Sequence, residues 1–261
     1  MNRELKVFFE TTNYCNFKCI YCFANTCQKN SIILPFDNYK KIIDDLSTLD
    51  WDLSILLEGG EPLVVDNICE YGKYAKKYAK KVALGTNGSL IQNLNQKQLD
   101  DIKNTFEEVS LSLDATDPEL FKKLTNHSIE PVLKGIDILN ENQIKIKICA
   151  VITKYNVEFD NLVKFCEEKN IKSLRFYWFI PRETNDHSLL PSEKDYEYML
   201  EKLKNYNGNV DIKINRTYTP FTNLVVSSKG EIKICADSER KNMQLIGSYN
   251  NFIDKLRMLL K

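Results

Sequence analysis

The feature that most constrains the fold is a regular alternation of short apolar segments with longer segments of helical periodicity. In the first helical segment, for example, Tyr39, Ile42, Ile43 and Leu46 recur at helical spacing. Strands that alternate with helices pair in parallel, because each helix returns the chain to the same end of the sheet. We expect strands at 5–10, 53–57, 82–86, 109–113, 144–153 and 174–180, and helices at 37–49, 68–80, 96–106, 131–140 and 157–168.

This alternation predicts an α/β fold, and the turns between its segments favour a barrel that does not close. No GxGxxG turn follows any of the expected strands, which disfavours a dinucleotide-binding sheet. We therefore expect a partial (β/α)6 TIM-type barrel over residues 1–190.

The pattern changes after residue 190, where we expect a small appendage over residues 191–261. Ser228-Lys229-Gly230 separates two short apolar segments, which is typical of a β-hairpin. The expected elements of the appendage are a helix at 192–206, strands at 210–214, 224–227 and 231–234, and a closing helix at 252–260.

Composition excludes several classes of protein. The 261 residues are 43% hydrophobic and 28% charged, which is ordinary for a globular domain. No run approaches the roughly 20 apolar residues of a membrane helix, and the charged start Met1-Asn2-Arg3-Glu4 is not a signal peptide. The 36 basic and 36 acidic residues cancel, so no strong general attraction to nucleic acid or anionic lipid follows. We expect a cytoplasmic protein that binds neither nucleic acid nor a membrane.

The cysteines are unevenly spread. Cys69, Cys149, Cys166 and Cys235 are scattered singly, and such residues are commonly small buried apolar side chains. A disulfide framework is not expected in a chain of this length without a secretory signal. The other four of the eight lie close together near the N-terminus, at Cys15, Cys19, Cys22 and Cys27.

The cluster contains the pattern CxxxCxxC, directly after the first expected strand. Three thiolates this close in sequence can meet at one metal centre, and soft thiolates select zinc or iron–sulfur. A structural zinc site needs four ligands, and Cys27 is available as a fourth sulfur. A [4Fe–4S] cluster held by only three cysteines instead leaves one iron open for a substrate or cofactor.

Beyond the cysteines, the residues resemble the radical S-adenosylmethionine (radical SAM) enzymes, whose signature places an aromatic residue before the last cysteine. Tyr21 stands there. Gly59-Gly60-Glu61-Pro62 follows the second expected strand, as the family's GGEP motif does. Thr86-Asn87-Gly88 follows the third, and Ser112-Leu113-Asp114 ends the fourth. The resemblance covers about residues 5–182.

The resemblance implies one [4Fe–4S] cluster and S-adenosylmethionine (SAM) as cofactors. In the family, an external low-potential donor of the flavodoxin or ferredoxin type reduces the cluster. Reductive cleavage of SAM then gives a 5′-deoxyadenosyl radical that abstracts hydrogen from a substrate. The implied metal ligands are Cys15, Cys19 and Cys22, and the implied SAM contacts are Tyr21, Gly59, Gly60, Glu61, Asn87, Ser112, Asp114, Ile152 and Asn156. Where the family often carries an Arg for the methionine carboxylate, this chain has Lys122 and Lys123.

The appendage suggests a peptide or protein substrate. The segment from Gly230 to Cys235 looks like a remnant of the SPASM/twitch extension of peptide-modifying relatives, which implies cross-linking or epimerisation. Cys235 has two interpretations, a buried hairpin residue or a hydrogen donor to a substrate radical. Arg175 and Tyr177 lie on one face of the sixth strand and would contact substrate if that face points inward.

Two alternatives stay open. Phe23, Leu34-Pro35 and the segment from Thr86 to Ile91 are similar to viperin, which implies a nucleotide dehydratase with cations near the barrel mouth holding a triphosphate. The remote alternative is a non-catalytic zinc or electron-transfer module.

Overall fold

The computed structural model describes residues 3–22, 31–181, 186–216, 219–237 and 242–260. The strands are β1 (Glu4–Glu10), β2 (Asp52–Glu58), β3 (Lys81–Thr86), β4 (Glu108–Ser112), β5 (Ile146–Ile152), β6 (Ser173–Trp178), β7 (Asp211–Asn215), β8 (Asn223–Val226), β9 (Glu231–Cys235) and β10 (Met243–Ser248). The helices are α1 (Phe36–Ser47), α2 (Ile68–Ala75), α3 (Gln96–Thr105), α4 (Pro118–Thr125), α5 (Glu130–Glu141), α6 (Asp160–Glu168), α7 (Glu193–Lys204) and α8 (Ile253–Leu259). In the described part of the chain, no helix combines the length and apolar character needed to cross a membrane.

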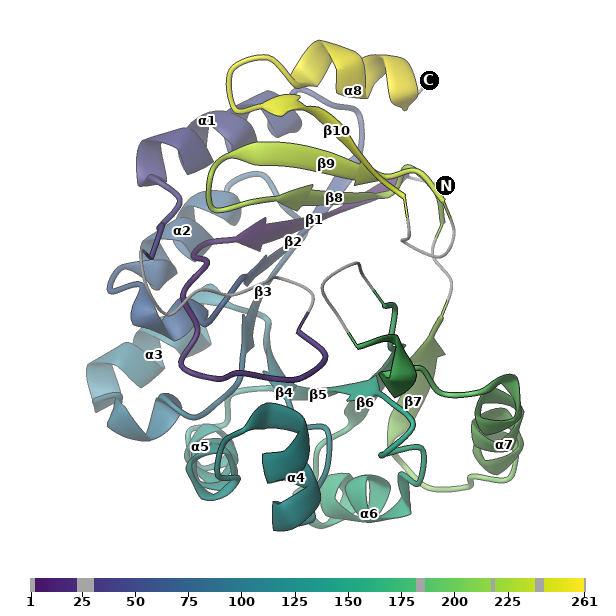
Figure 1. Ribbon diagram of the computed structural model, residues 1–261. Coiled ribbons are helices and arrows are strands. Elements are labelled where there is room, and N and C mark those ends of the chain that lie inside the picture. The colour runs from purple at the N-terminus through teal and green to yellow at the C-terminus, as the bar shows by residue number, and fades with distance from the viewer. Residues whose placement is uncertain (1–2, 23–30, 182–185, 217–218, 238–241, 261) are drawn as a thin grey trace.

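All of these strands form one ten-stranded sheet in the order β10-β9-β8-β1-β2-β3-β4-β5-β6-β7. Every neighbouring pair from β8 to β7 is parallel, whereas β9 and β10 are antiparallel. Figure 1 shows the strands as a curved sheet with helices α1, α2, α3, α5 and α6 along its outer side, whereas α4 lies next to the segment that follows β1. The strand order has two free ends, β10 and β7, so the sheet is the expected partial barrel.

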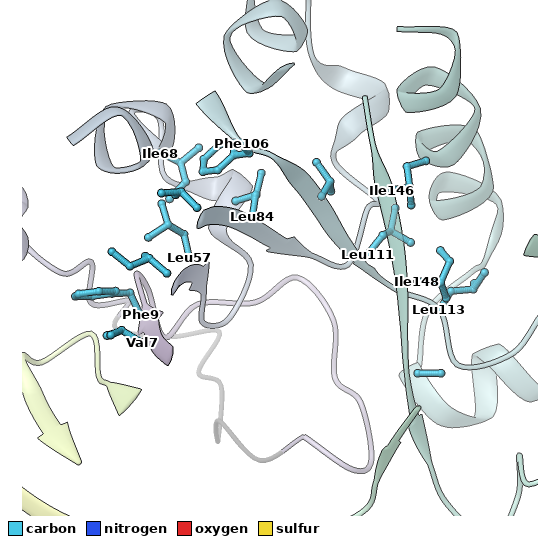
Figure 2. Packing of buried hydrophobic residues seen from close by; sticks show 14 of the residues in the cluster. Val7, Phe9, Leu57, Ile68, Leu84, Phe106, Leu111, Leu113, Ile146 and Ile148 are labelled. Atoms are coloured by element: carbon cyan, nitrogen blue, oxygen red, sulfur yellow. The ribbon is translucent and has the colours of Figure 1, made fainter. Parts of the chain in front are cut away.

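The outer face of the sheet carries the apolar core. Alternate residues of each parallel strand are buried against the helices, because side chains alternate between the two faces of a strand. Figure 2 shows Phe9, Leu57 and Leu84 from neighbouring strands together with Ile68 and Phe106 from the helical layer. Each side chain of this size contributes about 1.5–3 kcal/mol when fully buried.

The inner face is not apolar throughout. Ser110, Cys149 and Tyr177 lie on β4, β5 and β6 between the buried residues of those strands. The helix layer already buries the outer face, so the inner face is available for polar side chains and a ligand. Parallel strands bring their carboxyl ends to one rim, which is where (β/α) barrels carry their sites.

Two elements, α4 and β10, do not follow the expected pattern. Helix α4 begins at Pro118, and the Asp117 side chain caps it by accepting a hydrogen bond from the Leu120 N–H at 2.8 Å. Strand β10 was missed because Gly247, at φ +153°, interrupts its pairing with β9 and hides the alternation.

The strands after residue 190 do not form a separate sheet. Strand β7, which was expected in the appendage, is parallel to β6 and continues the barrel sheet. Strand β8 is parallel to β1 at the other side, and the expected hairpin β8–β9 turns at Gly230, which has φ +79°. The two expected parts of the chain therefore share one sheet.

This shared sheet predicts that damage to the C-terminal segment destabilises the whole fold. Phe252 is fully buried at the start of α8, whereas Met258 in the same helix is 67% exposed. Phe252→Ala should lower the free energy of unfolding by about 3–5 kcal/mol. Met258→Ala should change it by less than about 0.5 kcal/mol. Urea unfolding followed by circular dichroism should show one transition for both variants, and a separate early transition for Phe252→Ala would contradict a shared core.

Candidate functional site

The three clustered thiols face one cavity. Cys15, Cys19 and Cys22 lie on the segment after β1, and all three line a cavity of about 300 Å³ at the carboxyl ends of the strands. Among the described residues, no three His, Cys, Asp or Glu side chains are close enough together to chelate a single ion. The thiols therefore reach the cavity from separate positions on its wall. Cys27, the expected alternative fourth ligand, and Phe23 lie outside the described residues.

Helix α4 supports the middle of the cysteine segment. The Lys18 N–H donates to the Thr125 carbonyl at 3.3 Å, and the Ile20 N–H donates to the Leu124 carbonyl at 2.9 Å. The unpaired carbonyls at the end of a helix are thus used to fix a loop that has no regular structure of its own. Helix α4, which is not among the helices expected from the sequence, therefore helps to position Cys19.

Gly59 and Gly60 contact the other side of the cysteine segment. A Cβ on Gly60 would lie 1.8 Å from the Tyr14 carbonyl oxygen, and one on Gly59 would lie 2.5 Å from the Thr12 carbonyl oxygen. The Gly60 N–H donates to the Thr12 carbonyl at 2.7 Å across this contact. Both glycines also line the cavity. Their first structural role is therefore close backbone contact with the segment that carries Cys15, and the contact with methionine remains a proposal.

Glu61 joins the ends of β2 and β3. Its side chain is fully buried and accepts from the Thr86 hydroxyl at 2.7 Å, the Asn87 N–H at 2.8 Å and the Leu63 N–H at 3.0 Å. Burial raises the pKa of Glu61, and these hydrogen bonds oppose the rise. The carboxylate is not among the residues that line the cavity. Glu61 therefore joins the carboxyl ends of β2 and β3 from a buried position outside the cavity.

Asn87 connects this rim to the cysteine segment. Its side-chain amide donates to the Asn16 Oδ1 at 2.8 Å and lies 3.9 Å from the Cys15 sulfur. The Ser89 hydroxyl donates to the Asn87 Oδ1 at 2.6 Å. Asn87 lines the cavity, and its amide is already engaged with Asn16, the neighbour of Cys15.

Tyr21 and Asp114 meet across the cavity wall. The Tyr21 hydroxyl donates to the Asp114 carboxylate, which also accepts from the Val151 N–H at 2.7 Å. Burial raises the pKa of Asp114 to about 6, and the two hydrogen bonds oppose this rise. Both residues line the cavity, together with the exposed Ser112. The aromatic residue of the cysteine motif is thus tied to the end of β4.

The two weaker adenine candidates lie behind the cavity wall. Asn156 is 3% exposed, and its amide donates to the carbonyls of Asp114 at 3.0 Å and Val151 at 2.8 Å. Ile152 is 1% exposed and belongs to the apolar core. Neither is among the residues that line the cavity. Asn156 therefore orders the rim from a buried position.

The expected substrate contacts separate into two groups. Tyr177 lines the cavity. Arg175 lies on the same face of β6 but forms an ion pair with Asp211 and donates to the Asp211 carbonyl at 2.6 Å. Cys235 is fully buried, and its thiol donates to the Asp237 carbonyl at 3.1 Å. The structure therefore brings Tyr177, but neither Arg175 nor Cys235, into the cavity wall.

Several cavity residues were not singled out from the sequence. Phe8, Ser110 and Cys149 line the inner face of β1, β4 and β5, and Val225 and Met243 come from the C-terminal strands. Period-two alternation places Cys149 between Lys147 and Val151 on one face, but it does not say which face points inward. Lys123, considered as a replacement for the family's Arg, instead lies 3.4 Å over the Tyr155 ring.

The Gly60 contact generates a first prediction for the site. Gly60→Ala should lower the free energy of unfolding by about 4 kcal/mol or more, since a backbone carbonyl occupies the space of the added Cβ. Gly85→Ala is the matched control on β3, because its added Cβ would be no closer than 3.3 Å, to the Glu58 side chain. That control should change stability by less than about 1 kcal/mol. Equal urea midpoints for the two variants would contradict the proposed close contact.

The buried Asp114 carboxyl generates a second prediction, on pH. Because the folded-state pKa, about 6, exceeds the ordinary 3.8, the native state binds this proton more tightly than the unfolded state. The contribution of this group to stability is therefore present at low pH and is lost as pH rises to 6. Relative to Asp114→Asn, the wild-type unfolding free energy should fall by about 2 kcal/mol between pH 4 and pH 7. Urea titrations of the wild type and of Asp114→Asn across this pH range measure the difference in unfolding free energy. If that difference does not change with pH, the prediction is wrong.

Comparisons with known proteins agree with this geometry. Residues 9–167 match the family described as the Radical SAM superfamily. An S-adenosylmethionine-dependent nucleotide dehydratase of Selenomonas ruminantium is 29% identical over 258 residues, which cover 93% of this chain and 89% of that protein. The structure of anSMEcpe with bound AdoMet is similar with a TM-score of 0.76 and 19% identity, covering 97% of this chain and 80% of that chain. Streptococcus suis SuiB bound to precursor peptide SuiA is similar with a TM-score of 0.73 and 19% identity, covering 98% and 65%.

The two structural likenesses confirm the partial-barrel fold. The family match spans more than half of the chain, and it includes the three cysteines and the Gly59-Gly60-Glu61-Pro62 segment. The chain is therefore an enzyme that belongs to the Radical SAM superfamily.

Proposed function

We propose that this enzyme holds one [4Fe–4S] cluster on Cys15, Cys19 and Cys22 and cleaves SAM reductively to act on a nucleotide-type small molecule. The observation that carries the proposal is the shared cavity, in which these three thiols meet the residues at the carboxyl ends of β2, β3 and β4. The electron donor is proposed to be an external low-potential protein of the flavodoxin or ferredoxin type.

The donor set fits an iron–sulfur cluster. Three soft thiols line one cavity, and soft thiolates are the ligands that hold such clusters. Burial raises the pKa of Cys15 to about 11 and raises that of Cys19 further. Metal binding must therefore displace their protons, so loading should release acid. When bound, the cluster and SAM supply a 5′-deoxyadenosyl radical.

The chain's own residues would orient SAM from the rim. Gly59 and Gly60 line the cavity, and since glycine has no side chain of its own, their backbone is available to the methionine end. Asn87 and Ser112 offer polar groups at the ends of β3 and β4. Tyr21, fixed by Asp114, gives a rigid wall for the adenine. Glu61 and Asn156 keep this rim in shape from buried positions.

Two features favour a nucleotide over a peptide. The nucleotide dehydratase relative matches nearly the whole length of both proteins. Lys147 and Arg175 lie beside the cavity residues Ser110 and Cys149 in the strand register, with side chains only 18% and 17% exposed. Their partners in this structure are Glu108 and Asp211. A phosphate group can replace a carboxylate as the partner of such a cation.

A peptide is the second candidate, because much of the cavity wall is apolar. The aromatic residues Phe8, Phe121, Trp178 and Phe179 line it, as does Met243 of the C-terminal segment. Such a wall suits a hydrophobic side chain of a peptide as well as a base. The likeness to SuiB supports the fold of this chain and not its substrate.

The test is anaerobic reconstitution with iron and sulfide, followed by dithionite and SAM. The wild type should form 5′-deoxyadenosine, and Cys19→Ala should lose at least about 100-fold of this activity because one cluster ligand is missing. Cys166→Ala is the control, since this buried cysteine of α6 lies outside the cavity. A colourless protein with one bound zinc and no 5′-deoxyadenosine would instead support the zinc module.

The substrate class is tested in the same assay. A nucleoside triphosphate mixture should raise the rate of 5′-deoxyadenosine formation and give a modified nucleotide, detected by mass spectrometry. Stimulation by a peptide library alone would replace the nucleotide proposal with the peptide one.

A further inference from the structure

A second kind of thiol faces the cavity. Cys149 lies on β5, opposite Ser112 of β4 in the strand register, and is a free cysteine. It is partly exposed, and the cavity is the space that its side chain lines. It belongs to a strand rather than to the cysteine segment, so it is separate from the proposed cluster ligands.

Tyr177 of the neighbouring strand β6 lies opposite Val151, two residues after Cys149 on β5. Cys149 and Tyr177 both line the cavity. Strands β5 and β6 are regular and paired along their length, so the thiol has a defined position on a rigid element.

Ser110 shows that this part of the cavity is built to meet a ligand. Its side chain is 5% exposed, and its hydroxyl oxygen has no hydrogen-bond partner among the described residues. Ser110 lines the same cavity, two residues before Ser112 on β4. A buried hydroxyl without a partner costs stability, so a polar atom of a bound molecule is its natural partner.

The other single cysteines do not reach this position. Cys235 and Cys166 are fully buried, and neither they nor Cys69 are among the residues that line the cavity. Cys235 is nevertheless close, because it pairs with the lining residue Met243 across β9 and β10. Cys149, which lines the cavity, and Cys235, which lies next to it without lining it, can therefore be compared directly.

We propose that Cys149 is a hydrogen-atom donor to carbon-centred radicals formed in this cavity, an inference that rests on the radical chemistry proposed above. The S–H bond breaks homolytically and a C–H bond forms, because a thiol S–H bond is weaker than most C–H bonds. The carbon radical is thereby reduced by one electron and sulfur is oxidised to a thiyl radical. One electron from the external low-potential donor and one proton from solvent then restore the thiol.

The surroundings keep the sulfur protonated. Burial raises the pKa of Cys149 to about 11, and Glu108 also raises it, whereas Lys147, Tyr177 and Arg175 oppose the rise. At neutral pH the group is therefore a thiol, which can donate a hydrogen atom, and not a thiolate. The same proton exchanges with solvent, which makes the donor detectable.

The test uses D2O, thiol-free buffer, reconstituted enzyme, dithionite and SAM without substrate. A carbon radical cannot break the strong O–D bond of water, so solvent deuterium reaches carbon only through an exchangeable weaker bond such as S–D. Wild-type 5′-deoxyadenosine should carry one solvent deuterium at the 5′ carbon. Cys149→Ala and Cys149→Ser should lose this label while keeping iron content and the urea midpoint, since serine is close to cysteine in size but has no weak bond to hydrogen.

Cys235→Ala and Cys166→Ala are the matched controls and should retain the label. Loss of the label in Cys235→Ala, or its retention in Cys149→Ala, overturns the proposal. Absence of 5′-deoxyadenosine from the wild type refutes the proposed function itself, and the donor role with it.

A second measurement tests the exposure of Cys149 in protein without cofactors. In the protein without iron, a small alkylating reagent at pH 9 should modify Cys149 at least about tenfold faster than the fully buried Cys166, because reactivity follows exposure of the thiolate. Peptide mapping by mass spectrometry measures both rates. Equal rates would contradict an open position of Cys149 in the cavity wall.

Discussion

The backbone contact between Gly60 and the cysteine segment is the constraint on which the rest of the site depends. An added Cβ on Gly60 would lie 1.8 Å from the Tyr14 carbonyl oxygen, so only glycine lets the segment lie against the end of β2. The Glu61 N–H continues the contact by donating to the Tyr14 carbonyl at 2.7 Å. Since Cys15 follows Tyr14 directly, the end of a rigid strand sets the position of the first thiol. Glu61 then connects this contact to Thr86 and Asn87 at the end of β3.

The two faces of the sheet have different roles, because the outer face forms the apolar core and the inner face lines the cavity. Helices bury the outer residues of the strands, such as Val7 and Leu111, so the fold does not need an apolar inner face. The inner face can therefore keep Ser110, Cys149 and Tyr177, which would weaken an ordinary core. Strands β8 and β10 complete the cavity wall with Val225 and Met243. The C-terminal segment is thus part of the site and not only an attachment to it.

What the sequence could predict follows from the range of each interaction. The six barrel strands and the cysteine and Gly-Gly-Glu motifs depend on local periodicity and fixed spacing, and the structure confirms these strands in parallel order. The partner of β7 is not local, so its place beside β6 could not be inferred from its own residues. Cys149 and Cys235 show the same limit. Each is a single cysteine in a strand, and only the packed sheet shows which one faces the cavity.

The charges of the inner face suggest how a substrate is chosen. Lys147 is paired with Glu108 and Arg175 with Asp211, so these four groups cancel, as do the charges of the whole chain. Long-range attraction therefore contributes little to capture of an anion, and the phosphate of the proposed nucleotide substrate would have to replace a carboxylate at close range. The Ser110 hydroxyl, which has no hydrogen-bond partner in the described part of the chain, instead favours a ligand whose polar atom reaches it. A substrate that hydrogen-bonds to Ser110 would also lie close to Cys149, which lines the same cavity. In this position the proposed hydrogen-atom transfer from Cys149 to a substrate carbon would be possible.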